Sequence, residues 1–189
     1  MNISVFCGAT LPHNQEYTNA AKQLGQLIAQ GGHTLLYGGS NLGLMGEVSG
    51  EALRCGGHVV GVIPTLFSEE IIRSQAVTEL VRVRSMAERK EYLIARSDAF
   101  VALPGGIGTI DEVSEVMVMN QLQIVDDQRV LDGSYRTKPM ILLNIDGYYN
   151  PFLEQLRLVK EEGLMRSDAG LVAVSVVNEV FSLLERELS

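Results

Sequence analysis

The sequence predicts an α/β protein, because short apolar segments alternate with amphipathic helical segments along the whole chain. Three of the apolar segments end in glycine turns, at Gly8, at Gly38-Gly39 and at Gly105-Gly106. Strands that alternate with helices form parallel sheets, and uninterrupted apolar strands are those buried on both faces. We therefore expect a Rossmann-like, doubly wound parallel sheet with helices on both faces, with residues 1–189 as a single domain.

The composition narrows the class of ligand. Hydrophobic residues make up 46% of the chain and charged residues 20%, as in ordinary globular domains. The formal net charge of −8 argues against a nucleic-acid backbone or an anionic membrane as the main partner. We expect a small-molecule partner whose negative charges are held by local donors.

Three further features concern the cellular location, the cysteines and metal binding. The N-terminus lacks a basic segment ahead of an apolar core, and no apolar run reaches membrane-spanning length, so we expect a cytoplasmic protein. Two cysteines, Cys7 and Cys55, are too few for a disulfide framework, and we expect buried free thiols. The three histidines lack metal-ligand spacing, so we predict no metal, and we predict no cofactor either.

In the N-terminal half, the pattern predicts two strand–glycine turn–helix units followed by a third strand. Gly31-Gly32 and Gly56-Gly57 end the two helices. Strands are expected at 2–6, 33–37 and 58–63, and helices at 15–30 and 44–55.

The C-terminal half begins with a polar stretch at 65–85, which we interpret as a loop over the site with a short strand at 80–83. Ser85 is expected to cap a helix that runs to residue 96, and Asn178 to cap the last helix. A polar connection at 123–138 is longer than usual between packed elements. The remaining expected elements are strands at 99–103, 140–143 and 173–176 and a helix at 151–162.

The glycines after the strand at 99–103 predict an anion site. Gly105, Gly106 and Gly108 have no Cβ, so the backbone can turn sharply and expose its amides at the start of a helix, where the helix dipole favours negative charge. An alternative is a simple capping box, with Thr109 as the N-cap and Glu112 bonded back to its amide. The three glycines favour the phosphate site, although neither a dinucleotide fingerprint nor a P-loop is present.

Three strings then stand together: YGGSNLGLMG at 37–46, SMAERK at 85–90 and PGGIGTIDE at 104–112. Together they resemble the LOG ("lonely guy") family of cytokinin riboside 5′-monophosphate phosphoribohydrolases, formerly labelled possible lysine decarboxylases. The string NIDGYYN at 144–150 is also similar to the family's pattern. The last of the three strings matches the family signature P-G-G-x-G-T-x-x-E in full.

The resemblance implies site residues. Arg89 and Glu112 would be the catalytic pair. Met117 stands where the family commonly has a threonine, and Asp111 where it has a glutamate, which bears on base specificity more than on the chemistry. The substrate would be bound by Gly39, Ser40, Glu70, Lys90, Gly105, Gly106, Ile107, Gly108, Thr109, Ile110 and Asp111.

The residue types suit the implied reaction. Cleavage of a ribose–base N-glycosidic bond builds positive charge on the sugar, which a carboxylate such as Glu112 can stabilise while it orients a water. Arg89 is always charged and could hold that carboxylate ionised and in position. The alternative for Arg89 and Lys90 is a solvated helix face, on which Arg84 and Glu88 form an i,i+4 pair.

Two functions follow. The first is hydrolysis of AMP or of a cytokinin riboside 5′-monophosphate to the free base and ribose 5-phosphate. The alternative is a non-catalytic carrier of a nucleotide or of the molybdenum cofactor. The resemblance also implies a homodimer or a higher homo-oligomer, and the helix that follows Thr109 carries an apolar run wider than one buried face requires: Val113, Val116, Met117, Val118, Met119 and Leu122.

Overall fold

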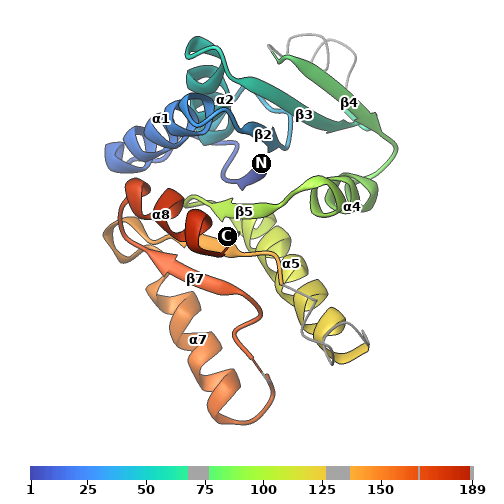
Figure 1. Cartoon of the computed structure of the whole chain (residues 1–189), viewed down its shortest axis with the longest axis vertical. Coiled ribbons are helices and arrows are strands. Elements are labelled where there is room, and N and C mark those ends of the chain that lie inside the picture. The colour runs from blue at the N-terminus through green and yellow to red at the C-terminus, as the bar shows by residue number, and fades with distance from the viewer. Residues whose placement is uncertain (68–76, 127–136, 166, 188–189) are drawn as a thin grey trace.

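The computed structural model describes residues 1–67, 77–126, 137–165 and 167–187 (Figure 1). The described strands are β1 (Asn2–Phe6), β2 (Thr34–Tyr37), β3 (His58–Pro64), β4 (Glu79–Val83), β5 (Ala99–Ala102), β6 (Met140–Leu143) and β7 (Leu171–Val174). They form one seven-stranded sheet in the order β4-β3-β2-β1-β5-β6-β7, and all neighbouring strands are parallel. The α/β prediction with a doubly wound parallel sheet is confirmed.

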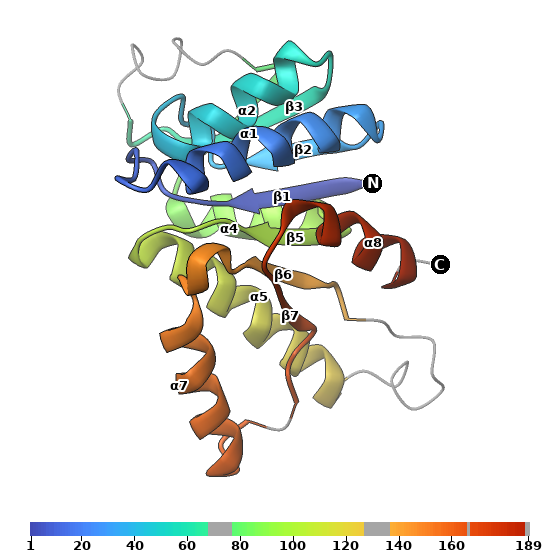
Figure 2. The ribbon, with the colours of Figure 1, turned by 90° about the vertical axis from the view of Figure 1, so that its left-hand side faces the viewer.

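The helical segments are α1 (Gln15–Gln30), α2 (Gly43–Arg54), α4 (Met86–Arg96), α5 (Ile107–Asp126), the 3-10 turn η1 (Ile145–Gly147), α7 (Asn150–Glu161) and α8 (Val177–Glu187). One hydrophobic core joins the sheet to α1, α2 and α8, and a second core joins its other face to α4, α5 and α7. Both views place α1 and α2 at one end of the molecule and α7 at the other (Figures 1 and 2).

The site is positioned by the order of the strands. After β1 the chain builds outward through β2, β3 and β4, and it then returns to place β5 on the other side of β1. The loops that leave β1 and β5 therefore diverge at the carboxyl edge of the sheet, where ligands of such folds bind. Gly8 follows β1 and Gly105 follows β5, so the two glycine turns lie next to each other at this edge.

The start of α5 differs from one expectation. The helix begins at Ile107, and the amides of Thr109 and Ile110 both donate to the carbonyl oxygen of Gly106. Gly106 is therefore the N-cap, a position that glycine tolerates well, and the capping-box alternative with Thr109 as the cap is wrong. The helix also continues to Asp126, because neither glycine nor proline occurs between Thr109 and Asp132. The first residues of the expected 123–138 connection are thus helical.

Two boundaries near the C-terminus also differ. Helix α8 begins at Val177, so Asn178 lies inside it, and the Asn178 side-chain oxygen accepts a hydrogen bond from Gln23 at 3.2 Å instead of capping the helix. Strand β7 begins two residues earlier than expected. It follows directly on a turn in which Ala169 and Gly170 both have positive φ, 50° and 73°.

The structure also bears on the cysteines, on metal binding and on membrane-spanning helices. Cys7 is buried, whereas Cys55 is only half-buried, and both are free thiols. The described residues contain no group of three or more histidine, cysteine, aspartate or glutamate side chains that could hold a metal ion. None of the helices in the described ranges combines the length and the apolar character that crossing a membrane requires.

Candidate active site

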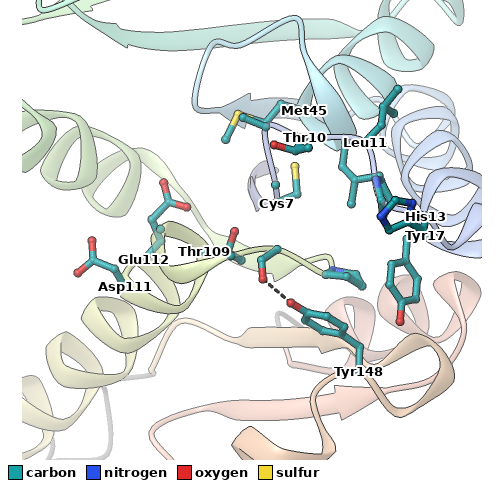
Figure 3. A pocket seen from close by; sticks show the side chains of 18 of the residues that line it. Cys7, Thr10, Leu11, His13, Tyr17, Met45, Thr109, Asp111, Glu112 and Tyr148 are labelled. Carbon is teal, nitrogen blue, oxygen red and sulfur yellow. Dashed lines mark hydrogen bonds between the residues drawn. The ribbon is translucent and has the colours of Figure 1, made fainter.

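A cavity of about 650 Å³ opens at the carboxyl edge of the sheet, between the loops that follow β1 and β5. Residues 7–13, the start of α2 and the inner face of α4 form part of its wall, and the glycine turn before α5 forms another part. Figure 3 shows Glu112 and Asp111 on one side of this cavity and His13 and Tyr17 on the opposite side. The cavity therefore joins the two features that the sequence predicts, the glycine turn and the charged pair.

Arg89 and Glu112 meet in the wall of the cavity. Ser85 caps α4 by accepting a hydrogen bond from the amide of Glu88, as expected, and one turn later Arg89 faces inward. Its Nη2 donates to Glu112 Oε1 at 2.6 Å. Arg89 is 7% exposed and Glu112 is 5% exposed, so the solvated-face alternative is wrong for Arg89. Arg84 and Glu88 do form the expected ion pair on the surface, at 3.2 Å.

Burial and Arg89 shift the pKa of Glu112 in opposite directions. Burial raises the pKa of the Glu112 carboxyl above its ordinary value, and the charge and hydrogen bond of Arg89 oppose that rise. Arg89 Nη1 contacts the sulfur of Met86 at 3.8 Å, while Arg89 Nε is buried and has no hydrogen-bond partner among the described residues. A buried, unsatisfied donor beside a cavity is typical of a site that is completed by a ligand.

Gly38, at the end of β2, makes room for Arg89. A Cβ on Gly38 would lie 2.6 Å from Arg89 Nη2 and 3.2 Å from the terminal carbon of Met45. Only glycine lets the guanidinium lie against this strand end. The next residue, Gly39, has a φ of 77° and turns the chain away, and a Cβ there would meet Val62 and Ile63 instead.

The glycine turn offers backbone donors. Within the part of the chain that the structure describes, the amides of Gly106, Ile107 and Gly108 have no acceptor, as expected for the first turn of a helix. Gly105 is closely enclosed, since a Cβ there would lie 2.2 Å from Thr109 Oγ1 and 3.0 Å from the amide nitrogen of Gly8. The amides and the positive end of the α5 dipole together suit a bound anion.

Comparison with known proteins agrees with this geometry. The family model described as "Possible lysine decarboxylase" matches residues 45–186. This chain belongs to that family. Members of known name include the probable cytokinin riboside 5′-monophosphate phosphoribohydrolase LOGL9 of Oryza sativa subsp. japonica, 45% identical over 148 residues. The cytokinin riboside 5′-monophosphate phosphoribohydrolase LOG2 of Arabidopsis thaliana is 37% identical over 186 residues.

These relatives are longer than this chain. The matched region covers 78% of the chain but 60% of the rice LOGL9 protein, and 97% of the chain but 82% of Arabidopsis LOG2. A second rice relative, the probable phosphoribohydrolase LOGL2, is 40% identical, and the match covers 66% of its length. The chain thus spans less than two thirds of the length of each of these two rice relatives.

Solved structures share the fold along the whole chain. The molybdenum cofactor binding protein of Rippkaea orientalis superposes with a TM-score of 0.70 at 25% identity, covering 100% of this chain and 97% of that one. The molybdenum cofactor carrier protein of Chlamydomonas reinhardtii gives a TM-score of 0.67 at 25% identity, covering 99% and 97%. The α/β architecture of this family is therefore shared with cofactor carriers.

The predicted substrate-binding residues divide into three groups. The cavity is lined by Gly105, Gly106, Gly108, Thr109 and Asp111. Glu70 lies outside the described residues. The residues that do not line the cavity are Gly39, Ser40, Lys90, Ile107 and Ile110.

Besides Gly39, the four residues that do not line the cavity have the following environments. The side chain of Ile107 is 85% exposed, and Ile110 packs against the core beneath α5. Ser40 Oγ accepts a hydrogen bond from the amide of Leu42 at 3.2 Å. Lys90 forms ion pairs with Asp111, at 2.9 Å, and with Glu115, and these two carboxylates raise its pKa. Lys90 thus links α4 to α5 beside the buried pair.

Sequence reasoning missed part of the wall. The loop after β1, which includes Thr10 and His13, lines the cavity together with Tyr17 and Tyr148. The sequence feature that could have identified this loop is Gly8, which belongs to a third glycine turn after a strand. The signal for Tyr148 was the string NIDGYYN at 144–150, which lies far along the chain from the glycine turn.

Proposed function

We propose that this protein hydrolyses the N-glycosidic bond of a nucleoside 5′-monophosphate, AMP or a cytokinin riboside 5′-monophosphate, to the free base and ribose 5-phosphate. The observation that carries the proposal is the buried Arg89–Glu112 pair, which shares one cavity with the free amides of the glycine turn. One feature suits a phosphate and the other suits a developing sugar cation.

In the proposed reaction the 5′-phosphate binds the amides at the start of α5, and this contact holds the anomeric carbon near Glu112. As the bond from C1′ to the base nitrogen breaks, its electron pair leaves with the base and positive charge develops on the ribose. The Glu112 carboxylate stabilises that charge and accepts a proton from the water that adds to C1′, and this proton then passes to the departing base, which leaves as the neutral free base. Arg89 keeps the carboxylate oriented through the 2.6 Å hydrogen bond.

The names of the relatives support the same reaction, since the rice and Arabidopsis proteins are called phosphoribohydrolases. The positions of the lysines do not support the older family description. The chain has four lysines, all of them among the described residues, and none lines the cavity. Lys90 is held by Asp111 and Glu115, and Lys138 Nζ donates to the carbonyl oxygen of Ile94 at 2.8 Å.

Incubation with AMP, followed by chromatography, tests the proposal. We expect free adenine and ribose 5-phosphate in equal amounts. Adenosine is the matched control, because it carries the same bond without the phosphate, and its kcat/KM should be lower by about 10² or more. Absence of adenine release from AMP and from N6-substituted riboside monophosphates would contradict the proposal, and equal kcat/KM for AMP and adenosine would contradict the phosphate assignment.

A carrier function is the second candidate, because the solved structures that share the fold bind the molybdenum cofactor. Under this alternative the cavity binds its ligand without cleaving it. Calorimetry that detects AMP binding without release of adenine would favour the carrier. Release of adenine that is lost in Glu112→Gln would favour the enzyme.

We also propose a homodimer that forms through the surface of α4 and α5. Val113, Val116 and Met117 are buried in the core, whereas Val118 and Leu122 remain 51% and 55% exposed. Met119 is also exposed and lines a cavity of about 530 Å³ between the two helices. Apolar side chains gathered on one surface are typical of a protein–protein contact.

A further inference from the structure

Two consecutive tyrosines bind the backbone on either side of Pro104. The Tyr148 hydroxyl donates to the carbonyl oxygen of Gly105 at 2.5 Å, and the Tyr149 hydroxyl donates to the carbonyl oxygen of Leu103 at 2.6 Å. Both tyrosines follow η1, and the two hydrogen bonds join residues 43 and 46 positions apart in the sequence. A segment next to β6 thus contacts the turn that follows β5.

The tyrosine segment is itself firmly held. Asn144 Oδ1 accepts a hydrogen bond from the amide of Tyr149 at 2.7 Å, and Asn144 Nδ2 donates to Asn150 Oδ1 at 2.8 Å. The rings of Tyr148 and Tyr149 pack edge to face with centroids 5.0 Å apart. Burial raises the pKa of Tyr149, so its hydroxyl stays protonated and remains a donor. Tyr148 lines the main cavity, whereas Tyr149 does not.

The bond to Gly105 has a consequence for the next amide. No peptide bond among the described residues is cis, so the C=O of Gly105 and the N–H of Gly106 point in opposite directions. Figure 3 shows Tyr148 on one side of the turn and Cys7 and Thr10 on the other side, across the cavity. With its carbonyl bound to Tyr148, this peptide directs the Gly106 N–H away from Tyr148, and Gly106 itself lines the cavity.

Without such a contact the peptide would have more freedom. It joins two glycines, and neither of them has a Cβ that would restrict rotation of the peptide plane. We propose that Tyr148 is a positioning residue for phosphate binding: its hydroxyl orients the Gly105–Gly106 peptide so that the Gly106 N–H donates to a phosphomonoester in the glycine turn. This inference deepens the proposed function and rests on it for the identity of the ligand.

Tyr148→Phe tests the inference, because phenylalanine keeps the ring and its contacts and removes only the hydroxyl. We expect the Kd for ribose 5-phosphate, measured by calorimetry, to rise about tenfold, the effect of one lost hydrogen bond to a charged group. The KM for AMP should rise by the same factor with kcat changed less than about twofold, because the contact is equal in ground and transition states. The kcat/KM for adenosine should stay unchanged, since adenosine has no phosphate.

Tyr149→Phe is the matched control. It removes a hydroxyl bond to the carbonyl of Leu103, but the following residue is Pro104, which has no N–H to orient. We expect this variant to lower the Tm and to leave the Kd for ribose 5-phosphate within about twofold of the wild type.

The outcomes separate this inference from the proposed function. A wild-type Kd in Tyr148→Phe, or an equal rise in both variants, would overturn the positioning role. Wild-type protein that binds ribose 5-phosphate but does not release adenine from AMP would overturn the proposed reaction, and the tenfold rise in Kd would then still support the role of Tyr148. Wild-type protein that does not bind ribose 5-phosphate would overturn both.

Discussion

Glu112 and Arg89 place opposite charges within 2.6 Å of each other in a largely buried setting. Such a pair adds little stability by itself, because the attraction is offset by desolvation, but removal of one partner leaves a buried charge uncompensated. Glutamine in place of Glu112 keeps the shape and the hydrogen-bond acceptor while it removes the charge. That substitution separates a catalytic role from a packing role.

We expect Glu112→Gln to lower kcat by about 10² to 10⁴ while the protein still folds and binds AMP, because the sugar cation loses its carboxylate. The release of adenine measures kcat, and calorimetry measures AMP binding. Glu88→Gln is the matched control, since Glu88 pairs with Arg84 on the surface at the start of α4, and its kcat should stay within about twofold. Near wild-type turnover in folded Glu112→Gln would leave Glu112 without a catalytic role.

The raised pKa of Glu112 predicts two opposite pH trends. The reaction needs the carboxylate, so kcat/KM should rise with pH through a pKa above the ordinary 4.5. The free energy of unfolding should fall over the same pH range. The unfolded chain loses this proton near 4.5, whereas the folded protein keeps it to higher pH, so ionisation of Glu112 lowers the free energy of unfolding as pH rises through this window.

Denaturant unfolding of wild type and Glu112→Gln from about pH 4 to about pH 8 isolates this residue, because glutamine does not titrate. The free energy of unfolding of the wild type minus that of the variant should fall as pH rises. A constant difference over the whole range, or an acid limb of kcat/KM that persists unchanged in the variant, would contradict the assignment.

At the scale of elements, the turn between β5 and α5 carries the proposed anion site. Its shape depends on contacts from three directions: Thr109 within α5, Gly8 after β1 and Tyr148 after η1. Each of these elements comes from a different part of the sequence, and all converge because β5 lies beside β1 and β6 in the sheet. The turn is therefore fixed by its neighbours as much as by its own glycines.

We expect Gly105→Ala to lower the free energy of unfolding by about 1–3 kcal/mol, because the added methyl group would meet the Thr109 side chain and the Gly8 backbone. Gly106→Ala is the control for stability alone. A Cβ there meets no other atom within 4 Å, so the unfolding free energy should fall only by the cost of alanine at an N-cap, less than about 1 kcal/mol. Equal stability of the two variants in denaturant unfolding would show that the turn is not enclosed as described.

At the scale of the whole molecule, the apolar residues on the outside of α5 suggest that the chain does not act alone. The N-terminal half of this helix carries the candidate site, and the exposed Val118 and Leu122 follow within three turns of it. A partner bound along α4 and α5 would therefore lie close to Arg89 and Glu112. Assembly and activity are thus expected to be linked.

The double variant Val118→Glu with Leu122→Glu should weaken the proposed homodimer by at least about 10²-fold in Kd, because two charges would be buried against an apolar surface. Light scattering and sedimentation at micromolar concentration measure the change. Leu164→Glu is the control, since Leu164 is also exposed, at 79%, but lies in the turn after α7. A wild-type monomer with full activity at these concentrations would contradict the proposal.

Local patterns along the chain are enough to predict the order and type of the elements. Apolar runs and 3.6-residue periodicity are local signals, and they located the strand at 2–6 and the helix at 15–30 without error. The three glycines after β5 likewise indicated exposed amides at a helix start, since the absence of a Cβ is a property of the residue alone. The resemblance carried by 85–90 and 104–112 singled out Arg89 and Glu112, which the fold brings together.

Which neighbours each residue meets depends on tertiary packing. The space at Gly38 exists for Arg89, a residue 51 positions away, and Lys90 faces Asp111 and Glu115 because α4 packs beside α5. Helix α5 begins at Ile107 and not at Thr109. The sequence allows either start, and the contacts of the turn select Ile107. The bond from Tyr148 to Gly105 depends on β6 lying beside β5. Such contacts join residues far apart in the chain, so no local pattern encodes them.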